Sequence, residues 1–323
     1  MKSRSITTLQ ENEKEDLVTA YLQRIGIVAE GIEGYQQRGP NANDLQNLYT
    51  AHLRTVPFEN MDQHDHSPGE NGQKEIPFIP RRKNLPSLDV KRSLNKIVYD
   101  KRGGFCFELN FSFAWLLRNM RYSIRLALAD VGCQQATTAG KFPAHVILLV
   151  DGLQNDQDNI DNENDLVYLV DPGFGNPGVC DLILPLVYDK PFMDSQGDIF
   201  EMKRDESGTH ERFDSILFRT RATTTGEQES MYRFCSRDNL DYFDSQFENG
   251  LDYVLTRSDM FNNNRICVLT TQNGGHVTLG TDYIKWVEKG KEVKRVELPS
   301  ESSWREALMT YFGVSLKSEI IQN

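Results

Sequence analysis

The stretch RGGFCFELNFSFAWLLRNM, residues 102–120, decides how the first third of the chain folds. Gly103 and Gly104 interrupt the preceding pattern, and their lack of side chains leaves room for a tight turn and for a substrate beside the backbone. After them, apolar residues recur every three or four positions, at Phe107, Phe111, Ala114, Leu117 and Met120. This spacing predicts an amphipathic helix with Cys106 within one turn of its N-terminus.

The spacing of apolar residues on either side of this helix predicts a helical part before it and a mostly β part after it. Helical spacing precedes the glycine pair at residues 17–25, 45–53 and 88–98. Apolar runs after Tyr122 predict strands at 124–131, 144–151, 166–171, 216–219, 266–271, 276–279, 283–287 and 293–298. A last helix has Ser303 and Glu306 as its capping box and Gly313 as its stop. We therefore predict an α+β fold with a helical domain at 1–121, a β domain at 122–236, and a linker with a small α/β domain at 237–323.

Composition excludes several classes of protein. The net charge of −11 over 323 residues argues against nucleic-acid binding. No apolar run is long enough to span a membrane, and residues 1–8 do not resemble a signal peptide. The five cysteines are odd in number and include no C-x-x-C pair, which indicates reduced thiols and a cytoplasmic location, not a disulfide framework or a zinc site. His64 and His66 lie in a charged stretch without a third ligand, so we expect no metal.

Three residues that are far apart in the chain have the properties of a catalytic triad. The predicted helix N-terminus would lower the pKa of the Cys106 thiol and favour the nucleophilic thiolate. His145 begins an apolar strand that could hold an imidazole base rigidly, and Asp171 ends the next strand, where it could orient that imidazole. Taken singly, each residue is more typical of a core or turn position. Together they indicate catalysis through a cysteine.

Five ordered blocks of sequence resemble the arylamine N-acetyltransferase family. They are YLQRIG at 21–26, HLRTVPFEN at 52–60, RGGFCFELN at 102–110, AHVILLV at 144–150 and VDPGFG at 170–175. The similarity runs from about residue 16 to about residue 316. It implies a helical bundle, a central antiparallel β-barrel and a C-terminal α/β lid around a Cys-His-Asp core like that of cysteine proteases.

The resemblance also implies an activity, typical of xenobiotic metabolism. Cys106 would be the nucleophile, His145 the general base and later acid, and Asp171 the orienting carboxylate. In a ping-pong reaction, the thiolate would take an acetyl or similar short acyl group from acyl-coenzyme A and pass it to an arylamine or arylhydrazine. Acetyl-coenzyme A would then be a co-substrate, with no tightly bound cofactor, and backbone N–H groups near Cys106 would form the oxyanion hole.

Further residues match family positions around this triad. The resemblance places Ser258, Gly173 and Gly175 near the coenzyme. It places Phe58, Phe174 and Phe261 in the substrate pocket. It gives Arg24, Glu59 and Arg102 a supporting role, in which a buried Arg–carboxylate pair fixes the cysteine loop. The expected partners are these small molecules, with no nucleic acid and no membrane.

The chain departs from the family pattern at four places, and rival interpretations remain. Residues 66–82 and 154–165 look like insertions, Pro172 replaces a small residue, and residues 137–143 are unusual. A cysteine hydrolase or transglutaminase would share the order Cys, His, Asp, and a binding protein could keep the fold without turnover. The sequence leaves open the preferred amine, the choice of acetyl, propionyl or malonyl donor, the oligomeric state and the role of the insertions.

Overall fold

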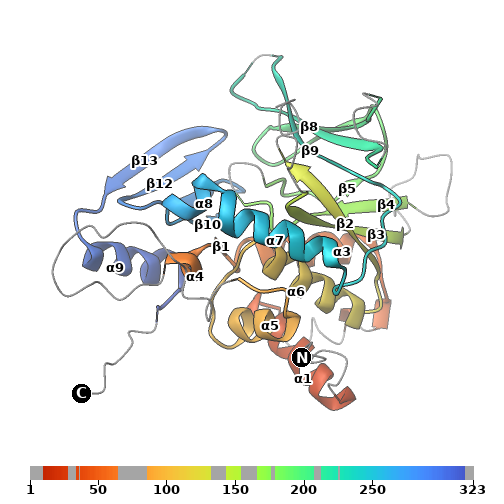
Figure 1. Cartoon of the computed structure of the whole chain (residues 1–323), viewed down its shortest axis with the longest axis horizontal. Helices are drawn as coiled ribbons and strands as arrows, with labels where there is room; N and C mark the ends of the chain where they lie inside the picture. Colours follow the sequence, from red (N-terminus) through yellow and green to blue (C-terminus); the bar gives the residue numbers. More distant parts are fainter. Residues whose placement is uncertain are drawn as a thin grey trace.

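The structure is a computed structural model that describes residues 10–27, 34–35, 37–64, 86–131, 143–153, 166–175, 179–206, 212–224 and 226–316. Helices from the first third of the chain lie beneath a curved sheet, and a smaller sheet from the last third lies beside them (Figure 1). The two apparent insertions and most of the unusual segment at 137–143 fall outside the described residues.

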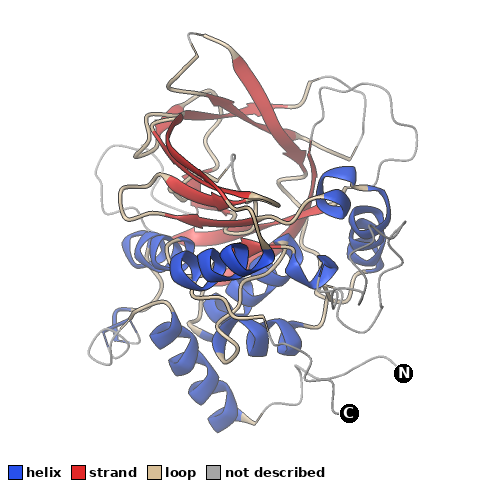
Figure 2. Ribbon diagram, turned by 90° about the vertical axis from the view of Figure 1, so that its left-hand side faces the viewer, coloured by secondary structure: helices blue, strands red, loops and turns tan. Residues whose placement is uncertain are grey.

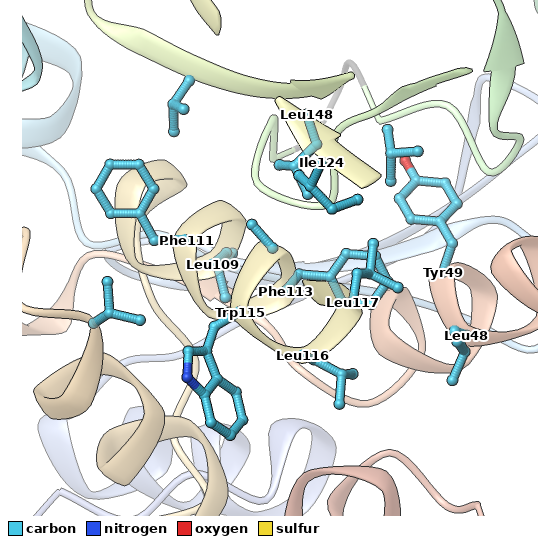
Figure 3. Close-up of a cluster of buried hydrophobic side chains, with 14 of the residues drawn as sticks. Leu48, Tyr49, Leu109, Phe111, Phe113, Trp115, Leu116, Leu117, Ile124 and Leu148 are labelled. Atoms are coloured by element: carbon cyan, nitrogen blue, oxygen red, sulfur yellow. The ribbon is translucent and has the colours of Figure 1, made fainter. Parts of the chain in front are cut away.

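The helix predicted from the opening stretch lies at the centre of the molecule. It is α6 (Cys106–Asn119), and all of its residues from Cys106 to Leu117 are buried. The other helices of the first third are α1 (Glu11–Arg24), α3 (Ala42–Leu53), α4 (Met61–His64) and α5 (Val90–Val98). In Figure 3, Ile124 and Leu148 of the sheet lie on one side of α6, and Trp115 and Leu116 point to the other. The periodicity predicted one buried face for this helix. The structure buries it on both sides, because the sheet covers one side and other helices cover the other.

The larger sheet has eight strands, all paired antiparallel, and forms a nearly closed barrel (Figure 2). Its strands lie in the order β5-β4-β3-β2-β9-β8-β7-β6. Their bounds are β2 (Ser123–Val131), β3 (His145–Leu153), β4 (Leu166–Val170), β5 (Leu184–Pro185), β6 (Pro191–Met193), β7 (Ile199–Arg204), β8 (Ser215–Thr220) and β9 (Gln228–Phe234). The architecture confirms the predicted α+β fold with its central antiparallel barrel.

Alternation along β3 explains why this strand reads as one continuous apolar run. Val146 and Leu148 belong to the core that the sheet shares with α6, whereas Ile147 and Leu149 belong to the core inside the barrel. Successive side chains of a strand point to opposite faces, so a strand between two cores is apolar at every position. His145, at an odd position, lies on the barrel side.

A second sheet joins the first third of the chain to the last third. Its strands are β1 (Phe58–Glu59), β10 (Cys267–Thr270), β11 (His276–Leu279), β12 (Tyr283–Glu288) and β13 (Lys291–Glu297), in that order. Helix α9 (Glu301–Phe312) packs on β10 and β11, and α7 (Ser245–Arg257) and α8 (Asp259–Asn263) precede them. Because β1 pairs with β10, a segment of the first third belongs to the sheet of the last third. The division at residues 121 and 236 stays a prediction.

Some local predictions need correction. Helix α9 begins at Glu301, and its N-cap is Ser300, whose side chain accepts from the Ser303 N–H; the predicted box of Ser303 and Glu306 is wrong. Gly313 ends the helix with a φ of 65°, as predicted. Helix α7 and strands β5, β6, β7 and β9 were not predicted, because they lack a long periodic apolar pattern. None of the helices in the described ranges has the length and apolarity to cross a membrane.

Asp194, in the turn between β6 and β7, makes the stability of the fold depend on pH. It is 9% exposed, and its Oδ1 accepts from the N–H groups of Gln196 and Asp198, each at 2.9 Å. Burial, followed by the nearby charges of Asp181 and Asp198, raises the pKa of this carboxyl to about 6. The folded state therefore binds a proton more tightly than the unfolded state, whose Asp pKa is about 3.9. The stability it contributes is complete below about pH 4 and is lost as pH rises through 6.

We predict that Asp194→Asn increases the free energy of unfolding at pH 7.5 by roughly 1–3 kcal/mol, because the amide keeps the accepting oxygen and removes the charge. Urea unfolding at pH 5 and pH 7.5 measures this gain, which should shrink at the lower pH. Asp282→Asn, at an exposed position, is the matched control and should change little. A gain that is equal at both pH values would contradict the prediction.

Candidate active site

Cys106 begins α6, with Phe105 as the N-cap, so the thiol lies at the helix N-terminus as predicted. The two glycines before it serve close packing. A Cβ on Gly103 would lie 1.8 Å from the carbonyl oxygen of Pro57, and one on Gly104 would lie 2.9 Å from the side chain of Glu108. The space beside Gly103, which we expected to admit a substrate, is filled by the backbone of Pro57. That expectation is wrong for Gly103.

His145 and Asp171 form a buried pair at the ends of adjacent strands. β3 and β4 are antiparallel neighbours, with Leu148 opposite Val170, so the start of one strand lies beside the end of the other. His145 Nε2 and Asp171 Oδ2 are 2.7 Å apart, and the two residues are 4% and 7% exposed. This strand arrangement is the one that the sequence predicted. It allows the carboxylate to fix both the orientation and the tautomer of the imidazole.

The thiol of Cys106 lies beside the first residues of β3. Its Sγ is 3.9 Å from the carbonyl oxygen of Ala144, the residue before His145. Burial and, after it, the charge of Asp171 raise the pKa of the thiol well above its usual range, while the N–H groups of Phe107 and Cys106 lower it. The N–H groups of the helix start thus favour the thiolate, as predicted, but burial opposes them more strongly. A direct contact of the sulfur with the imidazole stays a prediction.

Asn110 connects the thiol's helix to the His–Asp pair. It lies four residues after Cys106, one turn along the same face of α6. Its Nδ2 donates to Asp171 Oδ1 at 2.9 Å and to the carbonyl of Val146, and its Oδ1 accepts from the Gly173 N–H at 2.8 Å. One side chain thus joins α6, β3 and the loop after β4. Asn110 was not predicted as a site residue, although a polar side chain inside an apolar helix is a signal that could have identified it.

Two tyrosines hold Asp171 from other directions, and neither was predicted. The Tyr232 hydroxyl, on β9, donates to the Asp171 carboxylate, and the Tyr49 hydroxyl, on α3, donates to the Asp171 carbonyl at 3.3 Å. A cavity of about 20 Å³ lies behind them, bordered by Cys180 and Phe174 among others. That volume suits a single water molecule.

The predicted pocket aromatics separate into two groups. Phe174 contacts the imidazole of His145, with ring centroids 5.2 Å apart. Phe58 and Phe261 lie 5.9 Å apart, and both contact Phe105, the residue before the nucleophile, at 6.1 and 5.5 Å. Phe105 was not predicted as part of this group. The structure therefore places an aromatic cluster of Phe58, Phe105 and Phe261 next to Cys106.

The glycines predicted to contact a coenzyme have structural reasons of their own. Gly173 uses its N–H for Asn110, and a Cβ there would lie 2.9 Å from the Cα of Cys106. Gly175 has a φ of +70° and lies against the ring of Phe58. Ser258 separates α7 from α8 as the cap of both. Contact of these three residues with a coenzyme stays a prediction.

The predicted pair of Glu59 and Arg102 belongs to a larger buried charge cluster, together with Asp62, Lys96 and Glu108. Arg102 Nη2 lies 2.8 Å from Glu59 and 2.9 Å from Asp62. Lys96 Nζ lies 2.8 Å from Asp62, 3.0 Å from Glu108 and 3.5 Å from Glu59. Burial lowers the pKa of Lys96, but the three carboxylates outweigh it and raise that pKa above its usual value. The cluster contains two cations and three carboxylates, so the loss of either cation would leave buried negative charge without compensation.

The charge cluster fixes the loop that presents the nucleophile. Glu108 Oε2 accepts from the Phe105 N–H at 3.1 Å, and Glu59 Oε2 accepts from the Met61 N–H at 2.7 Å. Arg24 donates to the carbonyls of Ile97 and Lys101, at 3.1 and 3.3 Å. It supports the segment just before Arg102. Across the described ranges, no cluster of His, Cys, Asp and Glu is arranged to hold a metal ion.

Known proteins match this chain over most of its length. A family model described as N-acetyltransferase matches residues 41–321. An arylamine N-acetyltransferase of Escherichia coli is 23% identical over 285 residues, which are 85% of this chain and 83% of that protein. A pineal gland isozyme of arylamine N-acetyltransferase from chicken (Gallus gallus) is 30% identical over 136 residues, which are 42% of this chain but only 37% of that protein.

Solved structures share the fold. The arylamine N-acetyltransferase of Salmonella typhimurium has a TM-score of 0.71 and 21% identity, with 94% of this chain and 93% of that chain covered. The Mycobacterium marinum enzyme in complex with CoA has a TM-score of 0.67 and 18% identity, with 92% of each chain covered. At these identities the likeness establishes the architecture of helices, barrel and lid.

We predict that Lys96→Met lowers the free energy of unfolding by roughly 3–5 kcal/mol, because it leaves Arg102 alone among three buried carboxylates. Urea unfolding at pH 7 measures the loss. Lys91→Met, at an exposed position of the same helix, is the matched control and should stay within about 0.5 kcal/mol of the unmodified protein. Equal effects of the two substitutions would show that the charge cluster does not stabilise the fold.

Proposed function

Since the chain belongs to the arylamine N-acetyltransferase family, we propose that it transfers an acetyl or similar short acyl group from acyl-coenzyme A to an arylamine or arylhydrazine. One observation carries this proposal. The His145–Asp171 pair, 2.7 Å between Nε2 and Oδ2, is anchored through Asn110 to the helix that begins with Cys106. This arrangement supports the proposal that a nucleophile, a base and an orienting carboxylate act together from three parts of the chain.

In the proposed reaction, His145 moves the protons. With Nε2–H donated to Asp171, the Nδ1 nitrogen carries the lone pair and takes the proton of the Cys106 thiol. Burial disfavours an isolated thiolate here, so the thiolate forms as this proton transfers, paired with an imidazolium that Asp171 stabilises. In this proposal His145 accepts the proton of the thiol, which offsets the cost of burying the thiolate.

Two acyl transfers follow in a ping-pong sequence. The Cys106 sulfur attacks the carbonyl carbon of acyl-coenzyme A, the bond from that carbon to the coenzyme sulfur breaks, and His145 protonates the departing thiolate. The amine nitrogen then attacks the Cys106 thioester and loses a proton to His145. The carbon–sulfur bond breaks and the regenerated Cys106 thiolate regains its proton. Backbone N–H groups near Cys106 stabilise the oxyanion in both steps, typically worth a few kcal/mol.

Both substrates have proposed positions around Cys106. The aromatic cluster of Phe58, Phe105 and Phe261 provides a surface for the ring of an arylamine, and Phe174 borders the imidazole. We place acyl-coenzyme A, as a co-substrate, near Ser258 and the 173–175 turn. The shared fold with a structure determined in complex with CoA supports the use of the coenzyme, and its position at these residues is part of the proposal. Gly173 contributes packing there, since its N–H already bonds to Asn110.

The cysteine hydrolase alternative shares the order Cys, His, Asp but lacks the support of the family match across residues 41–321. We place the reaction in the cytoplasm. Four of the cysteines are described, Cys106, Cys180, Cys235 and Cys267, and all four are free thiols, which is typical of a reducing compartment.

We predict that acetyl-coenzyme A alone adds one acetyl group to the protein, on the peptide that contains Cys106, and that an arylamine then removes it. Mass spectrometry of intact and digested protein measures both events. Cys106→Ala should abolish the label and reduce turnover by at least about a thousandfold, whereas Cys235→Ser, a buried thiol elsewhere, should keep both. Turnover within tenfold of the unmodified enzyme in Cys106→Ala would overturn the assignment.

We also predict that Asn110→Ala slows thioester formation by roughly ten- to a hundredfold. It removes a hydrogen bond to a charged group, a loss of about 1.5–3 kcal/mol, which converts to that range of rates. Rapid-quench measurement of acetyl-enzyme formation across pH 6–9 tests it, and the pH profile should change as well as the maximum. Asn119→Ala, exposed on the same helix, is the control. A rate and a pH profile unchanged by Asn110→Ala would refute the role.

A further inference from the structure

Two side chains at the two ends of α4, Asn60 just before it and His64 at its last position, hydrogen-bond to the end of α8. The His64 Nε2 donates to the carbonyl of Phe261 at 2.7 Å. The Asn60 Nδ2 donates to the same carbonyl at 3.0 Å and to that of Asn264 at 2.8 Å, while its Oδ1 accepts from the Ile266 N–H at 2.8 Å. These contacts, which we call the α4–α8 tether, link parts of the chain about 200 residues apart.

Helix α8 depends on such support. It spans five residues, Asp259–Asn263, and the residue after it, Asn264, has an extended backbone conformation with φ −131° and ψ 131°. Carbonyl groups in the last turn of a helix have no partner within the helix, and a helix this short is not stable by itself. The tether supplies the missing donors, so the position of the α8 end is set by Asn60 and His64.

Phe261, whose carbonyl the tether binds, contributes its ring to the aromatic cluster. The Phe261 ring meets the Phe105 ring edge-on at 5.5 Å and the Phe58 ring at 5.9 Å. Phe58 and Asn60 are two residues apart in the chain, Phe105 adjoins Cys106, and the Phe58 and Phe105 rings are in contact, so the tether is linked to the nucleophile's loop. A shift of the Phe261 carbonyl would move its ring relative to the other two.

We infer that Asn60 and His64 are positioning residues for the amine-accepting half of the reaction, in which they fix Phe261 so that the cluster accepts an aromatic ring. This inference rests on the proposed function. It assigns the α4–α8 tether to acceptor choice. The first acyl transfer from coenzyme A requires the thiol, the base and the carboxylate, but not the Phe261 ring.

The test separates the two half-reactions. His64→Leu removes the donor to Phe261, and His64→Gln retains an N–H donor on a side chain of similar reach. His64→Leu should form acetyl-enzyme from acetyl-coenzyme A within twofold of the unmodified rate. Its acetyl-enzyme should react with a substituted aniline about three- to tenfold more slowly, the effect of one hydrogen bond, and with hydrazine, which has no ring, within twofold. His64→Gln should restore the aniline rate.

A second measurement reports on the tether without activity. Hydrogen exchange of the backbone amides of residues 259–264 should be faster in His64→Leu than in His64→Gln or the unmodified protein. His276→Leu, the same substitution on β11, is the control. It should change neither the exchange of residues 259–264 nor the aniline rate.

The outcomes are distinguishable. Faster exchange with an unchanged aniline rate, or an equal loss for aniline and hydrazine, overturns acceptor positioning while the proposed function stands. Unchanged exchange overturns the tether itself. If the unmodified protein forms no acetyl-Cys106, the proposed function fails, and this inference fails with it.

Discussion

Asn110 makes hydrogen bonds to three parts of the chain, and the geometry of the whole site depends on them. The amide donates to Asp171 and to the carbonyl of Val146, and it accepts from Gly173. Each partner is buried, so a lost bond would leave an unsatisfied polar group in the core. Because the same helix begins with Cys106, the bonds that satisfy this amide also fix the distance between the nucleophile's helix and the strand ends.

The charge cluster plays the same part on the other side of the nucleophile. Burying Lys96 and Arg102 with three carboxylates is costly in desolvation, and such an arrangement is weak support for stability by itself. Its value here is positional, since Glu108 binds the Phe105 N–H and Glu59 binds the Met61 N–H. The loop before Cys106 and the segment that leads into α4 are thereby held together, and the α4–α8 tether extends that frame to Phe261.

Burial has the largest influence on the pKa of the Cys106 thiol. A helix N-terminus favours a thiolate, yet the interior around Cys106 and the charge of Asp171 disfavour it more strongly. Formation of the Cys106 thiolate is therefore favoured by a nearby proton acceptor, a role that the His145–Asp171 pair can fill.

Sequence periodicity and composition determined the α+β order, the helix that starts at Cys106 and the adjacent strands of His145 and Asp171, because these features depend on local apolar spacing. The cap of α9, the short strands and α7 were missed, since weak local signals are overridden by packing. Only the tertiary structure revealed Asn110, Tyr232, the full charge cluster and the α4–α8 tether. Their partners lie from 12 to more than 200 residues away, and hydrogen bonds over such separations leave no periodic trace in a sequence.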